Sequence, residues 1–391
     1  MFTRYATQSD AGLTKNLISS AWKKRVFNYL FFSLFIFTFS FTPVRAQMLR
    51  DEATLRMLKS CMVSIYNMDI SDAEKTCDSI SGIWPGNPVK HLLKGAMIYW
   101  GNYPLLPASP LRQDFEKELK RCIELCNRQG RENNEEYLLI NLCARGMLLL
   151  FLSDNGISKE VFPWVPSTYW YLRHSFRYAD SIPDFCYFTG LYNYYREAYP
   201  RAYPVYKSLA LLFPKGNIEK GIEDLRTAAA RSVFLRAEGL SFLSWIYMTF
   251  EADYREANRY SKELYDLYPS NCQFQANYIK NLLLIKKYDE AERMIDSLSG
   301  TNANSFYQVQ IVALKGIIME KKYHNYDKAG ILYREVLDSV KVYGTFGDEY
   351  ASYAWFGLSR ISASENNKAD EDLFRKKALE LAVFRKLNFD N

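Results

Sequence analysis

The 391-residue sequence has few histidines and no complete catalytic or metal-binding motif. Its three histidines, His91, His174 and His324, lie far apart in sequence, whereas a zinc site usually needs several nitrogen or sulfur ligands. The patterns H-E-x-x-H, G-x-S-x-G and G-x-G-x-x-G and the calcium loop are all missing. We therefore expect no metal, no cofactor and no enzymatic activity. Acids that meet only in the folded chain keep a hydrolase open as an alternative.

Two stretches come near to chemical motifs without completing them. The segment "GNIEKGIE" at 216–223 has the glycine spacing of a phosphate loop, but Ile222 and Glu223 stand where Lys and Ser or Thr are needed. We assign this segment to structure. Glu238 is an acid inside the apolar run "LRAEGLSFLSWIYM". We interpret it as half of an ion pair with Arg236 or another neighbour, with a functional acid as the alternative.

The sequence also lacks a basic excess outside its first 46 residues. The whole chain carries a net charge of +6, and residues 1–46 hold six Lys or Arg against one Asp, which is +5. Subtracting +5 from +6 leaves the rest of the chain at +1. Net charge therefore gives no support to a nucleic-acid-binding surface.

Residues 1–46 read as a signal peptide. The basic "KKR" at 23–25 precedes the apolar run "VFNYLFFSLFIFTFSF" and then "TPVRAQ". At about 1.5 Å per residue this run spans about 24 Å, less than the roughly 30 Å hydrocarbon core, which favours cleavage over an anchor helix. Small residues Val44 and Ala46 place the cleavage before Gln47. We expect an exported protein, periplasmic or outer-membrane associated, with no later transmembrane span.

Seven cysteines follow the leader, an odd number that cannot all pair within one chain. None belongs to a C-x-x-C motif, so we expect most of them to be buried as small apolar residues. Cys61 with Cys77, on two helices expected to be antiparallel, is the first candidate for a disulfide. The absence of a cysteine directly after the apolar run argues against lipid attachment there.

A short pattern recurs through the C-terminal half of the chain. It reads "YREA" at 254–257, "YDEA" at 288–291 and "YDKA" at 326–329, so its alanines are 34 and 38 residues apart. Pro269 lies twelve residues after Ala257, and Pro85 lies twelve after Ala73. This spacing predicts pairs of antiparallel helices in which small residues allow close approach and a proline follows the second helix. The predicted repeat-packing positions are Ala73, Gly95, Gly221, Ala257, Ala291 and Ala329.

These residues resemble the tetratricopeptide repeat (TPR). The match is clearest over 217–300, good over 54–100 and looser over 305–386, and Trp245 departs from it where a small residue is expected. Residues 213–269 also show a faint similarity to the TPR proteins linked to inclusion-body clearance. The resemblance implies an all-α, antiparallel helix-pair solenoid, a TPR-like superhelix. We expect one continuous domain over 47–391 with an irregular section at 101–216, because no Gly/Ser linker separates the halves.

The stretch "GLYNYYREAYPRAYP" at 190–204 contains five tyrosines and two prolines. We expect a helix over 184–199 that Pro200 and Pro204 end. Its aromatic faces would pack against neighbouring helices, or else form a binding groove. Membrane insertion of this helix has least support, because polar residues interrupt it. The groove would be lined by Tyr192, Tyr195, Arg196 and Tyr199.

The resemblance and the missing catalytic motifs together favour a non-enzymatic scaffold or adaptor of the bacterial envelope. Its partner would be another envelope protein or a peptide segment, bound on the concave face of the solenoid. The alternative is a carbohydrate- or small-ligand-binding periplasmic protein that uses the tyrosine-rich helix. Asn277 and Lys280 do not complete the ladder of a carboxylate-binding TPR clamp.

Overall fold

The structure is a computed structural model that describes residues 47–128, 134–297, 305–382 and 389. All regular secondary structure in this part of the chain is helical, which confirms the predicted all-α class. Residues 51–391 form one compact unit, separate from residues 1–50. The leader at 1–46 lies outside the described residues, so its helix and its cleavage site stay predictions.

The α-helices, in chain order, are α2 (Glu52–Tyr66), α3 (Ile70–Ile83), α4 (Val89–Gly101), α5 (Arg112–Asn127), α6 (Glu135–Asp154), α7 (Ser158–Val161), α8 (Val165–Ser175), α9 (Pro183–Ala202), α10 (Lys207–Ala210), α11 (Ile218–Arg231), α12 (Arg236–Thr249), α13 (Tyr254–Leu267), α14 (Cys272–Leu284), α15 (Tyr288–Ser297), α16 (Ser305–Lys321), α17 (Tyr326–Ser339), α18 (Thr345–Ser364) and α19 (Lys368–Leu381). Short 3-10 helices are η1 (Met48–Arg50), η2 (Phe162–Trp164), η3 (Phe176–Tyr178), η4 (Pro204–Tyr206) and η5 (Val340–Tyr343).

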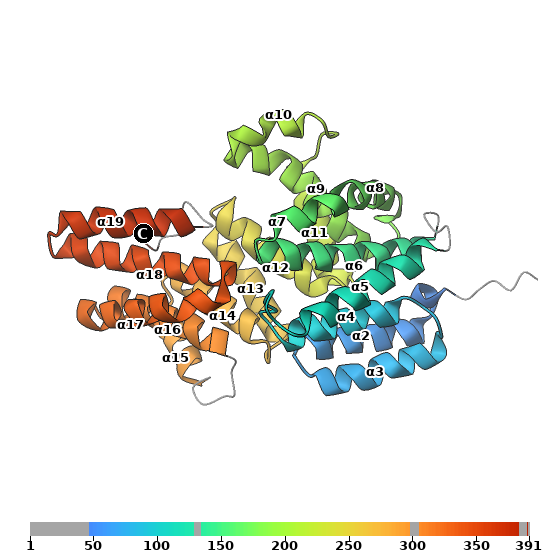
Figure 1. The fold of residues 1–391 in the computed structure, drawn as a ribbon, viewed down its shortest axis with the longest axis horizontal. Helices are drawn as coiled ribbons and strands as arrows, with labels where there is room; N and C mark the ends of the chain where they lie inside the picture. The colour runs from blue at the N-terminus through green and yellow to red at the C-terminus, as the bar shows by residue number, and fades with distance from the viewer. Residues whose placement is uncertain (1–46, 129–133, 298–304, 383–388, 390–391) are drawn as a thin grey trace, which may run out of the picture. The chain divides into compact units, whose positions relative to one another are not determined.

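Helices that follow one another pack as antiparallel pairs (Figure 1). The most extensive packing joins α9 to α11, α18 to α19, α12 to α13 and α16 to α17. The first helix of one pair also touches the first helix of the next, as α2 touches α4 and α16 touches α18. Each pair therefore buries its remaining apolar face against a neighbour, as in a helical solenoid.

A recurring turn marks the repeat register. The residue before the second helix's cap has a left-handed backbone at Met68, Ala252, His324 and Asn366, with φ between 51° and 62°. A side chain that accepts a backbone N–H follows directly, as Asp253 does for α13. Such N-caps satisfy amide groups that the first turn of a helix leaves unpaired. The same turn thus connects first and second helices in units far apart in sequence.

The six predicted packing positions are all buried at the helix contacts. A close approach of two helix backbones joins α9 to α11, where Gly190 faces Gly221. A Cβ atom on Gly221 would lie 2.6 Å from the backbone N of Tyr194 and 2.9 Å from the carbonyl O of Gly190. Only glycine permits two helix backbones to come this close.

Contacts between distant segments hold the compact unit together. The Asn271 side chain donates to the carbonyl O of Tyr66 at 2.7 Å, so the end of α2 is fixed to the turn between α13 and α14. The Tyr66 ring also lies edge-on to Trp100, with centroids 5.4 Å apart, and near Phe274 at 6.2 Å. The first helix pair therefore packs on residues about two hundred positions later in sequence.

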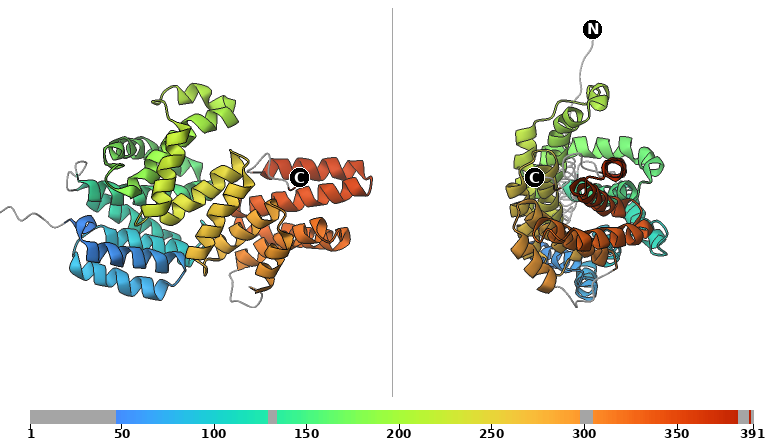
Figure 2. Two further views of the ribbon diagram at one scale, coloured as in Figure 1. Left: turned by 180° about the vertical axis from the view of Figure 1, so that it is seen from behind. Right: turned by 90° about the vertical axis from the view of Figure 1, so that its left-hand side faces the viewer.

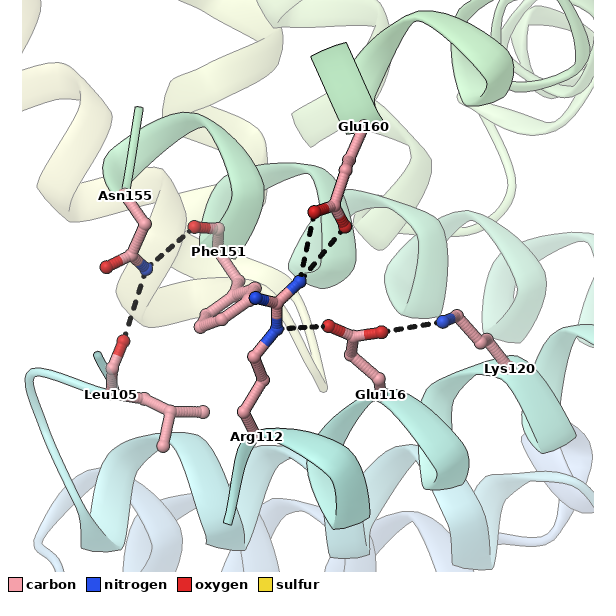
Figure 3. Close-up of polar contacts among 7 residues, drawn as sticks. All are labelled: Leu105, Arg112, Glu116, Lys120, Phe151, Asn155 and Glu160. Carbon is pink, nitrogen blue, oxygen red and sulfur yellow. Dashed lines mark hydrogen bonds and ion pairs between the residues drawn. The ribbon is translucent and has the colours of Figure 1, made fainter. Parts of the chain in front are cut away.

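Residues 101–216, the section predicted to be irregular, contain short helices that hydrogen bonds and ion pairs hold together. Figure 3 shows Arg112 of α5, whose Nε donates to Glu116 at 2.7 Å and whose Nη2 lies 3.0 Å from Glu160 of α7. Asn155 donates to the carbonyl O of Leu105 at 3.1 Å. Because Arg112 forms hydrogen bonds with two carboxylates, it fixes α7 to α5 where no repeat packing is available.

Helix α9 is longer than expected. It continues to Ala202, so Pro200 lies inside it and does not end it. A proline removes one backbone hydrogen bond, but Tyr203 still donates to the carbonyl O of Tyr199 at 2.8 Å. Pro204 instead begins η4.

The predicted Cys61–Cys77 disulfide is wrong. All seven cysteines, which lie within the described part of the chain, are free thiols. The Cys61 thiol donates to the carbonyl O of Ala73 at 3.5 Å, and burial raises the pKa of Cys61 to about 12. These cysteines serve as small apolar side chains.

Helix α6 is the one described helix that is long and apolar enough to cross a membrane, by length and composition. The expectation that no such stretch follows the leader is therefore wrong in those terms. Within the fold, 67% of the apolar stretch of α6 that meets this criterion is buried. This burial by neighbouring helices accounts for the apolar composition, since a central helix is apolar on all sides.

The Gly190–Gly221 contact generates the first prediction. Gly221→Ala is expected to lower the free energy of unfolding by about 1–3 kcal/mol, because its Cβ would meet backbone atoms that cannot rotate away. Urea unfolding followed by circular dichroism measures the change. The matched control is Gly82→Ala in α3, where nothing lies within 4 Å of the added Cβ. The control should gain about 0.5–1 kcal/mol from helix propensity. Equal effects of the two substitutions would contradict the close crossing.

Candidate functional site

The structure does not gather the four predicted groove residues into one site. Tyr192 and Arg196 face a later part of their own chain. The Tyr192 hydroxyl donates to the carbonyl O of Pro214 at 2.7 Å. Arg196 donates from Nε and Nη2 to the carbonyl O of Phe213, at 3.3 and 3.1 Å. Both side chains thus hold the segment that follows α9.

Tyr195 and Tyr199 contact other parts of the chain than Tyr192 and Arg196 do. The Tyr195 ring lies edge-on to Phe250 and Phe242 at 5.5 and 6.4 Å, and burial raises its pKa. The Tyr199 ring is 39% exposed and lies 4.8 Å from the ring of Tyr203. The tyrosine-rich helix therefore packs on two sides, and a groove for a sugar or small ligand is not favoured.

A different surface lies between α9 and α12. On α12, Glu238, Phe242 and Trp245 are spaced four and three residues apart, which places them on one face of the helix. All three are half-buried. Tyr187 and Tyr195 of α9 lie beside them, and the centroids of Tyr187 and Phe242 are 5.8 Å apart. We call these five residues the α9–α12 stripe.

Glu238 is the polar centre of this stripe. Its Oε2 atom is shielded from solvent and has no hydrogen-bond partner among the described residues. The predicted pair with Arg236 is not formed, because Arg236 donates to the carbonyl O of Ala229 at 3.1 Å and lies 3.8 Å from Glu263. Burial raises the pKa of Glu238 to about 7, although a hydrogen bond from Tyr66 opposes the shift.

Tyrosines from separate helix pairs surround this carboxyl group. Tyr66 of α2, Tyr99 of α4 and Tyr187 of α9 all lie close enough to Glu238 for its charge to raise their pKa values, after burial as the main cause. Asp154, at the end of α6, is hydrogen-bonded to Tyr99, and burial raises the pKa of Asp154 to about 7. Sequence reasoning singled out Glu238 but missed Asp154 and the three tyrosines, which come from distant segments.

Asp184 sets the position of α12 relative to α9. Its carboxylate accepts the backbone N–H groups of Val233, Phe234 and Leu235, at 2.9, 2.7 and 3.2 Å. These three amides lie in the turn between α11 and α12, just before the first residue of α12. The carboxylate therefore holds the turn that leads into α12 against the first turn of α9, and so fixes the position of the α9–α12 stripe.

The chemistry of this region is polar but holds no metal-binding set. Across the described ranges, no group of three or more His, Cys, Asp and Glu side chains could hold a metal ion. His91 is bonded to Glu118 at 2.6 Å, and His174 lies 2.8 Å from the carbonyl O of Trp170. These histidines are therefore engaged with partners other than Glu238 and Asp154.

Lys280, considered above for a carboxylate clamp, is part of an internal ion pair. Its ammonium lies 2.7 Å from Glu349 Oε1 of α18, and the same oxygen accepts from the Tyr353 hydroxyl at 2.6 Å. Lys280 is 2% exposed. Its charge is used inside the fold, where removing one partner of such a pair is costly.

The raised pKa values generate a pH prediction. A folded-state pKa of about 7 for Glu238, against an ordinary 4.5, means that the folded protein holds this proton more tightly than the unfolded chain. The free energy of unfolding should therefore fall as pH rises from about 4.5 to 7, by on the order of 2–3 kcal/mol for this group. Asp154 acts in the same direction.

Unfolding in urea at pH 5 and pH 8 measures this loss of stability. Glu238→Gln should flatten the pH dependence and stabilise the protein at pH 8. The control is Glu219→Gln, at an exposed position on α11, which should leave the profile of the parent protein unchanged. A Glu238→Gln profile identical to that of the parent would refute the assignment.

Comparison with known proteins adds little to this geometry. No protein-family model and no curated protein matches the chain. Among solved structures, it is similar to a tetratricopeptide repeat protein from Parabacteroides merdae ATCC 43184, with 12% sequence identity and a TM-score of 0.31. The alignment covers 83% of this chain and 99% of that chain. This similarity does not establish a shared family, and it bears neither on inclusion-body clearance nor on export. The helix-pair architecture therefore rests on the contacts described above.

Proposed function

We propose that this chain is a non-enzymatic, TPR-type helical-repeat protein that binds another protein and acts as a scaffold or adaptor in the bacterial envelope. The observation that carries the proposal is the α9–α12 stripe. It combines the half-buried rings of Tyr195, Phe242 and Trp245 with a carboxylate oxygen that is shielded from water and unpaired within the described chain.

Aromatic rings at a binding surface give a large contact area at a low cost in side-chain entropy, and they are common among residues that dominate binding energy. A shielded carboxylate oxygen without a donor, such as Glu238 Oε2, costs roughly 1–3 kcal/mol, which a donor from a bound partner would offset. The stripe therefore suits a protein segment that brings an apolar side chain together with an N–H, Lys or Arg donor. Phe242 and Glu238 are the residues we assign to these two contacts.

The envelope location rests on the leader. Residues 1–46 combine a basic start, an apolar run too short to span a membrane comfortably and small residues before Gln47. Export and cleavage near Ala46/Gln47 make the partner an envelope protein or a segment of one. The carbohydrate-binding alternative has less support, because Tyr192 and Arg196 are engaged with backbone carbonyls.

Site-specific photocrosslinking in intact cells tests this function. A crosslinking residue at Phe242 should capture an envelope protein, whereas one at the exposed Lys262 of α13 should not. Mass spectrometry identifies the captured protein and the N-terminal peptide of the chain itself. A peptide that begins at Gln47 is expected, and an intact leader would contradict cleavage.

Two substitutions then test the residues. Phe242→Ala and Glu238→Gln should each weaken recovery of the partner by about tenfold or more, as for residues at the centre of an interface. Lys262→Ala is the control, and circular dichroism must show that all variants keep their helices. Equal capture from both crosslinking positions, or unchanged binding by Phe242→Ala, would refute the stripe as the binding surface.

A further inference from the structure

Residues 203–213, which contain η4 and α10, expose an unusual number of apolar side chains. Val205, Leu211 and Leu212 are 79%, 82% and 76% exposed, and Leu209 is 51% exposed. Figures 1 and 2 show α10 standing away from the paired helices of its unit. Single exposed apolar residues are ordinary, but a contiguous group indicates an interaction site. We call residues 203–213 the α10 segment.

Hydrogen bonds from α9 hold the base of the α10 segment, by which we mean residues 213–216 at its C-terminal end. Arg196 donates to the carbonyl O of Phe213, Tyr192 donates to that of Pro214, and Glu197 accepts the N–H of Gly216 at 3.1 Å. The Tyr206 ring lies 5.1 Å from the ring of Tyr199 at the end of α9. The protein therefore holds the base rigidly while the leucines face solvent, which is not the arrangement of a loop that simply lacks packing.

Charge distinguishes this segment from other exposed surfaces. Arg201, Lys207 and Lys215 are exposed, and no acidic residue occurs between Glu197 and Glu219. Tyr203 and Tyr206 add aromatic rings beside the leucines. Exposed leucines flanked by cations and tyrosines are typical of segments that lie in the interface of a membrane. The polar residues that oppose insertion of α9 lie beside the base and leave the tip apolar.

We propose that the α10 segment docks on the surface of an anionic lipid bilayer. The side chains of Val205, Leu209, Leu211 and Leu212 enter the boundary between headgroups and acyl chains, at a depth of about 5–10 Å. Arg201, Lys207 and Lys215 lie at the level of the lipid phosphates. Charge complementarity favours this occupant over a second copy of the chain, because two such segments would bring six cations together.

Vesicle co-sedimentation tests the proposal. The protein that begins at Gln47 is used, because it contains the compact unit 51–391 and omits the apolar leader, which would bind lipid by itself. It should sediment with vesicles that contain phosphatidylglycerol and bind far less to vesicles of phosphatidylcholine alone. Leu211→Ser/Leu212→Ser should reduce binding at least tenfold, which is about 1.4 kcal/mol. Lys207→Gln/Lys215→Gln should reduce it by about fivefold per cation.

The control is Ile331→Ser/Val342→Ser, which removes two apolar side chains with 64% and 71% exposure at other positions. This variant should bind vesicles like the parent protein. The proposal is overturned if the parent does not bind the anionic vesicles, or if Leu211→Ser/Leu212→Ser binds as well as the control. It is also overturned if the leucine variant changes self-association in size-exclusion chromatography but leaves vesicle binding intact. Because the readout is lipid, failure here leaves the proposed protein partner of the α9–α12 stripe unaffected.

Discussion

The close approach of α9 to α11 is the contact on which both proposed surfaces depend. Gly190 and Gly221 bring the two backbones so near that an added Cβ on either residue would meet main-chain atoms. Side chains can rotate away from a clash, but a helix backbone can only shift as a whole. The crossing therefore fixes α9 along its length. The first turn of α9 presents Asp184 to the turn before α12, and further along the helix Arg196 and Tyr192 donate to Phe213 and Pro214 where the α10 segment ends.

Hydrogen bonds from side chains of α9 to backbone groups position the two neighbouring segments, α12 and the α10 segment. Asp184 accepts the amides of the turn that leads into α12, so the position of α12 relative to α9 follows from this carboxylate. Arg196 donates to the carbonyl O of Phe213, so the direction of the α10 segment follows from the same helix. Hydrogen bonds between charged side chains and backbone groups are strong and directional. They explain how one helix orients two surfaces that differ in chemistry.

The sequence predicted the helix pairs because small residues, aromatic spacing and prolines are local signals. Ala257, Ala291 and Ala329 are buried as the 34- and 38-residue spacing requires, and Pro269 follows the end of α13. The partners of the tyrosine-rich helix could not be predicted in the same way. Tyr192 and Arg196 bind backbone carbonyls, which every residue possesses and which therefore leave no mark in a sequence.

The sequence predicts the burial of Glu238 but not the residues that surround it. An acid in an apolar run indicates burial, and this signal is local. Its neighbour Tyr66 lies 172 positions earlier in the sequence, at the end of α2, where Asn271 donates to the Tyr66 carbonyl O. Which tyrosines surround the carboxyl group thus depends on contacts between distant helix pairs, and one sequence without an alignment holds no record of them.

A protein that keeps a shielded carboxylate and a group of exposed leucines accepts two unfavourable features at once. Burial of Glu238 lowers the free energy of unfolding as pH rises from about 4.5 to 7, and exposed leucines favour association in water. The Gly190–Gly221 contact and the Asp184 hydrogen bonds, which join α9, α11 and the turn before α12, involve neither feature. Features that cost stability and solubility without contributing to the fold are best explained by binding. The two surfaces have opposite chemistry, acidic and aromatic at the stripe but cationic and aliphatic on the α10 segment, and we therefore propose a different partner for each, a protein for the stripe and a lipid bilayer for the α10 segment.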